Sequence, residues 1–240
     1  MDAVAFALSF KLSLWTACLL VPVGVLVART LAYQVRRGRA VLEGLIALPL
    51  VLPPTVLGFY LLAALGEASP LGALWTTVFG KGLAFSFEGL VAASLVANLP
   101  FAVQPALRAF EAIRPELREA AWVSGLSPWR TFWTVEAPLA WPGVLTGFVL
   151  VFAHTMGEFG VVLMIGGSIP GETRTAALAI YDRVQAFDDS GAGVLAAALV
   201  AALLAMLVAA VFALSASWMI FELTIFSLSS IDLSTEYPLL

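Results

Sequence analysis

The chain has 240 residues, of which 61% are hydrophobic and only 12% are charged, and its mean hydropathy is +0.99. Soluble globular proteins carry roughly a quarter charged residues, so this composition excludes a soluble domain and indicates an integral membrane protein. The net charge of −4 and the pI near 5.0 provide no basic surface for a nucleic acid, which excludes nucleic-acid binding as a main role.

Five stretches between successive charges are long and apolar enough to cross a membrane. A helix that spans the roughly 30 Å hydrocarbon layer needs about 20 apolar residues. The first stretch contains Lys11, whose long side chain can reach the interface, and Cys18, a lone cysteine that excludes an intramolecular disulfide. We therefore expect one membrane domain over residues 1–240, with spans near 8–28, 44–66, 87–107, 138–162 and 193–219 and a C-terminal tail at 222–240.

The basic residues are unevenly distributed between the two predicted sides of the membrane. Cytoplasmic loops retain an excess of Lys and Arg. Eight arginines lie in the loops that follow the first and third spans, namely Arg29, Arg36, Arg37, Arg39, Arg108, Arg114, Arg118 and Arg130. Four basic residues lie on the opposite side, namely Lys11, Lys81, Arg174 and Arg183. With five spans, this distribution predicts an outside N-terminus and a cytoplasmic C-terminus.

Proline and glycine interrupt the second and third predicted spans. The interrupting residues are Pro49, Pro53, Pro54 and Gly58 in the second span and Pro100 and Pro105 in the third. Broken backbone at membrane depth is tolerated only against protein or a water-filled cavity, so we expect these helices to line a pathway. Membrane helices carry more Pro and Gly than soluble ones, which explains a single proline better than it explains the Pro53-Pro54 pair.

The segment from 108 to 138 is more polar than its surroundings and too long for a simple connection. Pro115 suits the first position of a short helix, and Gly125 suits a left-handed helix terminator. Ser127 can cap a second, aromatic-rich helix that carries Trp129. The pattern predicts a helix, a glycine turn and a second helix, which composition alone would make an interfacial amphipathic hairpin.

Within this segment, Glu119-Ala120-Ala121 is followed by Gly125 and then by Val135-Glu136-Ala137-Pro138. The pattern resembles the cytoplasmic signature of permease subunits of prokaryotic binding-protein-dependent ABC importers, with Val135 and Ala137 as small apolar departures. The resemblance implies an all-α fold of the type I permease, with five transmembrane helices and a cytoplasmic coupling-helix loop. It also implies that a separate ATPase subunit docks on the coupling helix, at Glu119, Ala120, Ala121, Gly125 and Leu126.

Further motifs resemble one branch of that family, the molybdate permeases of the ModB type. These motifs are LPLVLPPTVLGF at 48–59, GEFG at 157–160, SIPGETRT at 168–175 and Ile180-Tyr181. Sulfate permeases are similar but usually carry Tyr where Phe159 stands. The resemblance implies a homodimer in the prokaryotic cytoplasmic membrane that receives molybdate or tungstate from an extracytoplasmic binding protein. The position of His154 is commonly Arg in these permeases, so this chain departs from them in lacking a fixed charge there.

Polar residues within the predicted spans are few, and they form no dense cationic site. They are Asn98, Gln104, His154, Thr155 and Glu158. A dianion in a low-dielectric layer would cost tens of kcal/mol, so water or polar groups must accompany it. The pathway candidates are Pro53, Pro54, Asn98, His154 and Glu158, while the residues that bind the anion stay open. His154 and Glu158 are four residues apart and can pair, which we favour over anion contact because Glu158 would repel the substrate.

The sequence contains no G-x-x-x-x-G-K-S/T motif, so we expect ATP and Mg²⁺ to be bound by the partner ATPase. We expect no catalytic residue, metal or cofactor in this chain. Its expected partners are a second copy, two ATPase subunits, the binding protein and membrane lipid. Two alternatives are a sulfate or thiosulfate permease and, more remotely, an intramembrane hydrolase that uses His154, for which HExxH and G-x-S-x-G motifs are lacking.

Overall fold

The computed structural model describes residues 2–229, with side chains described through Ala216 and at Met219. All regular structure within that part of the chain is helical. The first half contains α1 (Ala3–Tyr33), α2 (Arg39–Val51), α3 (Pro54–Leu65), α4 (Pro70–Phe79), α5 (Phe87–Ala97) and α6 (Leu99–Glu111). The second half contains α7 (Pro115–Val123), α8 (Pro128–Thr131), the π-helical turn η1 (Phe132–Glu136), α9 (Ala137–Gly157), α10 (Gly160–Gly166), α11 (Ala176–Gln185) and α12 (Asp189–Ser229).

Three helical stretches are long and apolar enough to cross a membrane alone: α1, the run Pro128–Gly157, and Asp189–Ala216 of α12. Two bent pairs, α2 with α3 and α5 with α6, reach the required length only together, so the number of spans is five if each pair is one span. The membrane protein expected from composition and the all-α fold implied by the resemblance are thus confirmed. The last helix is longer than the stretch at 193–219 and includes the start of the expected tail, while residues 230–240 lie outside the described residues.

Prolines set the position of the sharpest bend. Helix α2 ends at Val51, and Pro54 occupies the first turn of α3. Proline has no N–H to donate and clashes with the preceding helical turn, so the helix cannot continue through the pair Pro53-Pro54. The axes of α2 and α3 differ by 105°, whereas those of α5 and α6 differ by 41° at Asn98. Residues 44–66 therefore do not form one straight helix.

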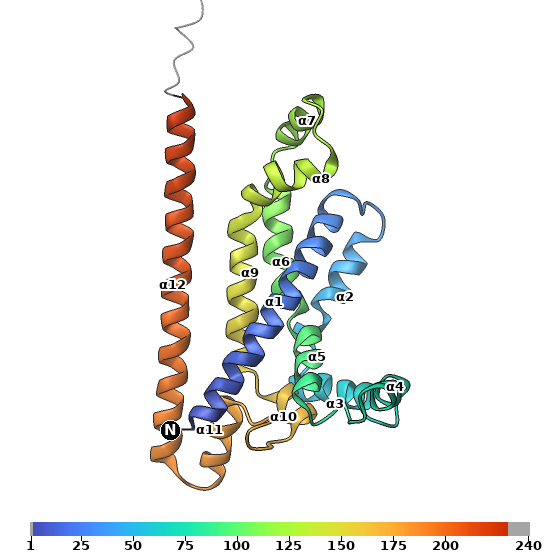
Figure 1. Cartoon of the computed structure of the whole chain (residues 1–240), viewed down its shortest axis with the longest axis vertical. Helices are drawn as coiled ribbons and strands as arrows, with labels where there is room; N and C mark the ends of the chain where they lie inside the picture. The colour runs from blue at the N-terminus through green and yellow to red at the C-terminus, as the bar shows by residue number, and fades with distance from the viewer. Residues whose placement is uncertain (1, 230–240) are drawn as a thin grey trace, which may run out of the picture.

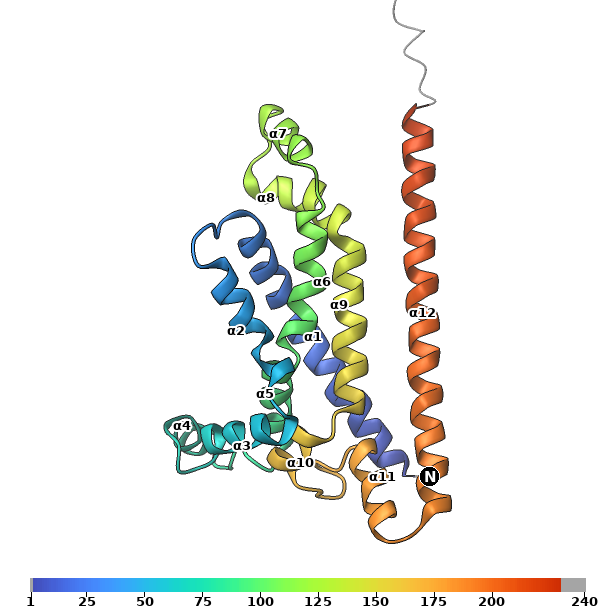
Figure 2. The same cartoon turned by 180° about the vertical axis from the view of Figure 1, so that it is seen from behind.

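The two arginine-rich loops lie at the same end of the molecule. Figure 1 shows α7, α8 and the α1–α2 loop at one end and α4, α10, α11 and the start of α1 at the other. Helix α12 lies beside the bundle and extends from one end to the other, as the reverse view in Figure 2 also shows. We call the end that carries α7, α8 and the α1–α2 loop the hairpin end, and we call the other end the opposite end. The arrangement agrees with the charge asymmetry of the sequence, which requires both loops to share one side of the membrane.

Helices α1, α6 and α9 pack closely through small residues. A Cβ added to Gly24 of α1 would lie 2.8 Å from the Cβ of Ala102 on α6. A Cβ added to Gly147 of α9 would lie 3.3 Å from the carbonyl oxygens of Phe101 and Ala102. Small residues of this kind allow membrane helices to approach one another. Helices α1, α6 and α9 thus each pack against the other two.

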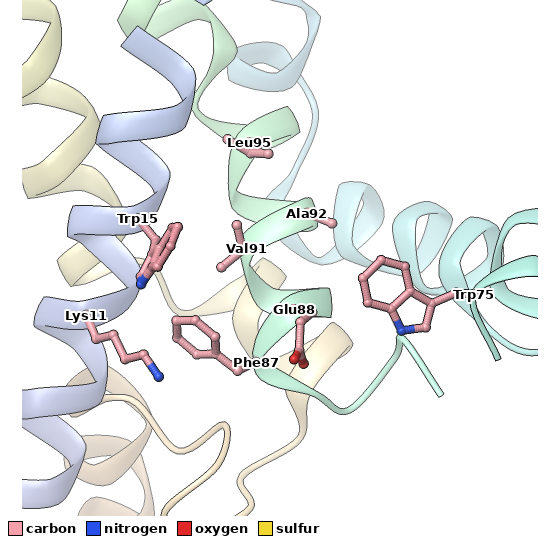
Figure 3. A pocket seen from close by; sticks show the side chains of 8 residues that line it. All are labelled: Lys11, Trp15, Trp75, Phe87, Glu88, Val91, Ala92 and Leu95. Atoms are coloured by element: carbon pink, nitrogen blue, oxygen red, sulfur yellow. The ribbon is translucent and has the colours of Figure 1, made fainter. Parts of the chain in front are cut away.

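A pocket of about 440 Å³ opens between α1, α4 and α5. The Nζ atom of Lys11 lies 4.3 Å from the ring centroid of Phe87, and Trp15 and Trp75 line the same pocket (Figure 3). The ammonium group lies over an aromatic face, which is a favourable cation–π arrangement. The stem of Lys11 thus runs along apolar surface while its charged end keeps a partner, as expected of a lysine within a span.

Candidate functional site

Three helix breaks converge on a cavity of about 120 Å³. Its walls are Pro49, Leu50, Leu52, Pro54 and Leu57 from the α2–α3 break, Ala97 and Phe101 from the α5–α6 break, and His154, Glu158 and Val161 from the α9–α10 break. Of the predicted pathway residues, Pro54, His154 and Glu158 line this cavity directly. Pro53 precedes Pro54, and Asn98 reaches the cavity through a hydrogen bond to His154.

Glycines allow the broken helices to approach each other. A Cβ on Gly160 of α10 would lie 2.7 Å from the Cβ of Pro54, and a Cβ on Gly58 of α3 would lie 2.8 Å from that of Met164. Real Cβ atoms do not approach so closely, so α3 and α10 pack together only because both positions are glycine. The motifs at 48–59 and 157–160, which are far apart in the sequence, form the two sides of this contact.

His154 and Glu158 are the polar side chains of the cavity wall, and Asn98 lies behind His154. Asn98 Nδ2 donates to the carbonyl oxygen of Ser94 at 2.8 Å, which leaves Oδ1 as the acceptor for His154. His154 Nδ1 lies 3.0 Å from that oxygen and donates to it. The imidazole also lies against Phe101, with 4.5 Å between ring centroids. These contacts fix the orientation of the imidazole and direct Nε2 toward Glu158.

Glu158 has a structural role that sequence reasoning missed. It follows the last residue of α9 with an extended backbone (ψ 130°), although the sequence predicts a span to residue 162. Its Oε1 accepts the N–H of Val161 at 3.0 Å and so caps the start of α10. Its Oε2 lies 3.6 Å from His154 Nε2, which is too far for a hydrogen bond. The expected pairing is therefore a contact without a hydrogen bond, between an imidazole in the last turn of α9 and the carboxylate that caps α10.

The cavity is suited to water more than to a firmly held anion. It has room for several water molecules, and none of its lining residues is Lys or Arg. The remaining polar candidates do not add a cation, because Thr155 donates to the carbonyl of Val151 at 2.7 Å and Gln104 is exposed on α6. Among the residues whose side chains are described, no group of three or more His, Cys, Asp or Glu is placed to hold a metal ion.

The hairpin formed by α7 and α8 has the capping contacts that the sequence predicts, and we call residues 115–131 the coupling hairpin. Gly125 has φ +81°, which is the left-handed conformation. The N–H groups of Gly125 and Leu126 donate to the carbonyls of Trp122 and Ala121 at 2.9 and 3.0 Å. This bonding is the Schellman pattern of a helix C-terminus. The turn thus ends α7 and directs the chain back toward the bundle.

Most of the predicted docking residues lie at the surface of the coupling hairpin. Glu119, Ala120 and Gly125 are exposed, Leu126 is half-buried, and Ala121 faces the interior. The exposed set also includes large apolar side chains, namely Leu117, Trp122, Val123 and Trp129, with Val123 89% exposed. A cluster of exposed apolar side chains on an otherwise polar loop marks an interaction surface.

A buried ion cluster joins the coupling hairpin to the bundle, and sequence reasoning did not find it. Glu136, the last residue of η1, is fully buried. Arg29 of α1 and Arg118 of α7 each contact one of its carboxylate oxygens, at 2.5 and 2.9 Å. The sequence offered only two signals, a carboxylate inside the signature segment and two arginines counted as cytoplasmic charge. Neither signal places the three residues together, because they are 107 and 18 positions apart.

Comparison with known proteins gives the family. The model of the family described as "Binding-protein-dependent transport system inner membrane component" matches residues 21–221. The molybdenum transport system permease protein ModB of Azotobacter vinelandii is 50% identical over 200 residues, which cover 83% of this chain and 88% of that protein. ModB of Escherichia coli K12 is 38% identical, over 75% of this chain and 79% of its own length. The probable sulfate transport system permease protein cysT of Chlorella vulgaris is 31% identical, over 80% of this chain and 72% of its own length.

Solved structures share the fold at low sequence identity. The structure of a bacterial alginate ABC transporter in complex with an alginate-bound periplasmic protein matches with a TM-score of 0.71 at 16% identity, over 87% of this chain and 76% of that chain. A second structure, of a bacterial ABC transporter that imports alginate, matches with a TM-score of 0.69 at 18% identity, over 91% of this chain and 79% of that chain. These structures confirm the fold, and the family match with the sequence relatives confirms the resemblance to binding-protein-dependent permeases. By its family match and its relatives, the chain belongs to the inner-membrane components of binding-protein-dependent transport systems.

Proposed function

We propose that this chain is the permease subunit of an ATP-driven importer for molybdate or tungstate. Two copies form the translocation pathway, two ATPase subunits dock on the coupling hairpins, and an extracytoplasmic protein delivers the anion to the opposite end. ATP and Mg²⁺ are bound by the ATPase subunits, so this chain itself needs no cofactor. Relatives named as molybdenum permeases cover most of the chain, which supports the choice of anion.

The observation that carries the proposal is the coupling hairpin itself. It combines an exposed α7, a left-handed terminator at Gly125 and exposed apolar side chains such as Val123 and Trp122. A buried role would not leave these side chains in contact with solvent, and a membrane role is disfavoured by the charges of Glu116 and Glu119 beside them. The surface therefore suits a protein partner at the hairpin end.

The converging helix breaks supply a physical basis for alternating access. Helices bend most easily where intrahelical hydrogen bonds are already missing, and the breaks at Pro53, Asn98 and Glu158 surround one cavity. Rotation of the half-helices about these points would open the cavity to one end or the other without breaking a regular helix. Water in the cavity would accompany the anion, which a packed apolar layer would exclude.

The orientation that fits this mechanism places the hairpin end in the cytoplasm. That end carries the arginine-rich α1–α2 loop as well as the hairpin (Figure 1), and cytoplasmic loops retain basic residues. The N-terminus then lies outside, close to α11 at the opposite end. In this orientation α4, α10 and α11 face the binding protein.

Transport by the reconstituted complex tests the proposal. The chain, its ATPase and its binding protein are placed in liposomes, and uptake of radiolabelled molybdate is measured with ATP, with ADP and without the binding protein. We expect uptake only with ATP and binding protein together, and we expect competition by tungstate. Absence of ATP-dependent uptake under these conditions would show that the assignment is wrong.

A second candidate is a sulfate or thiosulfate permease. It is favoured by relatives named as probable sulfate permeases, which are 31% to 33% identical to this chain. Phe159 stands where such permeases usually carry Tyr, and its ring packs against Tyr181 with 4.9 Å between centroids. Unlabelled sulfate and thiosulfate in the same uptake assay separate the two candidates, because a sulfate permease would lose molybdate uptake to an equal concentration of sulfate.

A further inference from the structure

We propose that Arg29, Glu136 and Arg118 form a positioning linkage through which the coupling hairpin drives the membrane helices. The inference rests on the proposed function, because it assigns how movement of the hairpin reaches the pathway. Arg118 belongs to α7, Arg29 to α1, and Glu136 stands where η1 passes into α9. One carboxylate thus ties the hairpin to two helices of the bundle.

The two arginines occupy both oxygens of the same carboxylate. Arg29 Nε lies 2.5 Å from Oε2 and Arg118 Nε lies 2.9 Å from Oε1. The side chain of Glu136 has no exposed surface, and the two arginines keep 22% and 18% of theirs. Because an unpaired buried carboxylate is costly, the position of Glu136 depends on the presence of both cations. Withdrawal of Arg118 would therefore release Glu136 as well as α7.

Aromatic contacts hold Arg118 in one orientation. Its guanidinium carbon lies 3.5 Å from the ring centroid of Tyr33 and 5.0 Å from that of Trp122. Tyr33 is the last residue of α1, and its hydroxyl donates to the carbonyl oxygen of Phe110 on α6 at 2.8 Å. A planar guanidinium suits such stacking better than an ammonium group does. A tilt of α7 must therefore carry Tyr33 and Glu136 with it or break these contacts.

The π-helical turn delivers this movement to α9. Such turns insert an extra residue into a helix and are frequent at functional sites. Here the turn joins α8 to α9 within one continuous stretch, Pro128–Gly157. His154 lies 18 residues beyond Glu136, about 27 Å along a helix at 1.5 Å per residue. Displacement of Glu136 along the axis of α9 thus reaches the cavity at the far end of the same helix.

The energetics favour a positional role for this cluster over a stabilising one. Burial of charged groups is costly, and apolar replacements of buried ion clusters are often equally stable. The cluster is therefore a weak source of stability, yet it fixes the distance between three elements. Because both arginines bind the same carboxylate, α1, α7 and the start of α9 must move together while these contacts last.

A distance measurement tests the positioning role without any transport. Spin labels are placed at Val123→Cys and Gln34→Cys in a Cys18→Ala background, and labelled chain is diluted with unlabelled chain so that a dimer carries one labelled copy. We expect Arg118→Gln to broaden or shift the distance between α7 and the end of α1. The matched control is Arg114→Gln, which alters an exposed pair with Glu116 at 3.4 Å. An unchanged distance in Arg118→Gln overturns the proposal.

The ratio of anion transported to ATP hydrolysed tests the coupling role. We expect this ratio to fall about tenfold in Arg118→Gln and Glu136→Gln, a change within the range seen for coupling mutations, while the ATPase still co-purifies. Arg118→Lys keeps the charge but loses the planar stacking, so it should recover part of the ratio of anion transported to ATP hydrolysed. The comparison of Arg118→Lys with Arg118→Gln still tests the coupling role if Glu136→Gln fails to insert into the membrane.

The two measurements together separate failure of this inference from failure of the proposed function. A shifted α7 with an unchanged transport ratio would overturn the linkage as a coupling element. If the parent complex shows no ATP-driven uptake of molybdate, the proposed function fails, and the spin-label distances still decide whether the cluster positions α7. A fall in the ratio with Arg114→Gln as large as that with Arg118→Gln would also overturn the inference, because it would make the effect one of general surface charge.

Discussion

His154 and Glu158 lie 3.6 Å apart across the end of α9, and this separation determines what substitutions should do. A charged side chain within a membrane span is costly unless it is paired, by about 2.5 to 3.5 kcal/mol on insertion scales at the helix centre and by less toward the helix ends. Arg in place of His154 would bring such a charge, and Glu158 stands within reach to pair with it. Neutral substitutions at position 154 remove only the hydrogen bond to Asn98 and the packing on Phe101.

We therefore expect His154→Ala to lower molybdate uptake by no more than about tenfold, the scale of one neutral hydrogen bond. His154→Arg should assemble and transport while Glu158 is present. Glu158→Gln, which keeps an oxygen to accept the N–H of Val161, should be mild alone and severe together with His154→Arg. Assembly and uptake of the two single variants and the double variant form a mutant cycle. Simple additivity would show that the two residues do not interact.

Glu158→Ala should behave differently from Glu158→Gln. Alanine removes the oxygen that caps α10, and the loss of such a cap costs about 1 kcal/mol. We expect lower thermal stability of the purified complex for Glu158→Ala than for Glu158→Gln. Equal stability of the two variants would remove the capping role that the 3.0 Å contact to Val161 indicates.

Asp188 stands before α12 and gives a pH-dependent contact outside the membrane spans. The N–H of Gly191 at 2.9 Å, followed by Arg183 and Ser190, lowers the pKa of its carboxyl below the ordinary value. A carboxyl with a lowered folded-state pKa stabilises the fold above its unfolded pKa of about 3.9, and this stabilisation is lost as the pH falls through the folded value.

We expect the amide of Gly191 to lose protection from hydrogen exchange as the pH falls through the lowered pKa of Asp188, which lies below the ordinary aspartate value of about 4. Asp188→Asn should make this protection independent of pH over the same range. Asp189→Asn, one residue later in the first turn of α12, is the matched control and should keep the pH dependence. A pH profile of Asp188→Asn identical to that of the parent would assign the effect to another group.

The helix terminator at Gly125 belongs to the scale of the element. A non-glycine residue in the left-handed region costs about 1–2 kcal/mol, and no neighbouring atom lies within 4 Å of a Cβ built there. Gly125→Val therefore strains the backbone without a clash and should redirect α8 relative to α7. We expect reduced co-purification of the ATPase and loss of ATP-driven uptake, with partial recovery in Gly125→Asn because Asn tolerates this conformation.

Gly38 offers a matched control for Gly125→Val. It has φ +74°, and a Cβ built there also meets no atom within 4 Å, but it lies in the α1–α2 loop. Gly38→Val should carry the same backbone strain and retain the ATPase. If the two variants lose the ATPase alike, the effect reflects strain at the hairpin end in general, and the docking assignment of α7 fails.

The elements also show which features a sequence can predict. Capping chemistry is local, so Pro115, Gly125 and Ser127 gave the coupling hairpin its helix starts and its turn. The pair Pro53-Pro54 indicated a break but not its angle of 105°, because that angle depends on the contact of Gly58 and Gly160 with α10 and α3. Five apolar stretches were expected, yet only three of them form helices that span alone.

Contacts between distant segments were beyond the reach of sequence patterns. The cluster of Glu136 with Arg29 and Arg118 depends on how α1, α7 and η1 pack. The hydrogen bond from His154 to Asn98 joins residues 56 positions apart. The i,i+4 spacing of His154 and Glu158 was read correctly as proximity, but α9 ends between them, so Glu158 caps the next helix as well.

At the scale of the whole molecule, α12 indicates how much of the surface awaits a partner or lipid. Its apolar stretch Asp189–Ala216 has only 11% of its residues buried within this chain. Figure 1 shows most of this helix beside the bundle and not within it. Water would be a poor solvent for such a surface, so lipid or a protein partner must cover it, and the proposed homodimer would supply one such partner.

Orientation and the path of the bent helices can be tested together by cysteine labelling. Gln34→Cys lies in the α1–α2 loop, Ala68→Cys lies between α3 and α4, and Ala186→Cys lies before α12; all three positions are exposed. Cys18 is exposed as well, so each variant is made in a Cys18→Ala background. An impermeant maleimide is then applied to intact cells and to inside-out vesicles.

We expect positions 68 and 186 to react from outside intact cells and position 34 to react only in inside-out vesicles, because the basic α1–α2 loop should face the cytoplasm. Position 68 also decides between two paths for the bent pair. If α2 and α3 together cross the membrane despite their 105° bend, residues 34 and 68 lie on opposite sides; a re-entrant loop would return residue 68 to the side of residue 34. Reaction of position 34 from outside would show that the orientation is the reverse. Reaction of positions 34 and 68 from the same side would show fewer spans, with the Pro53-Pro54 break at the tip of a re-entrant loop and not in the middle of a span.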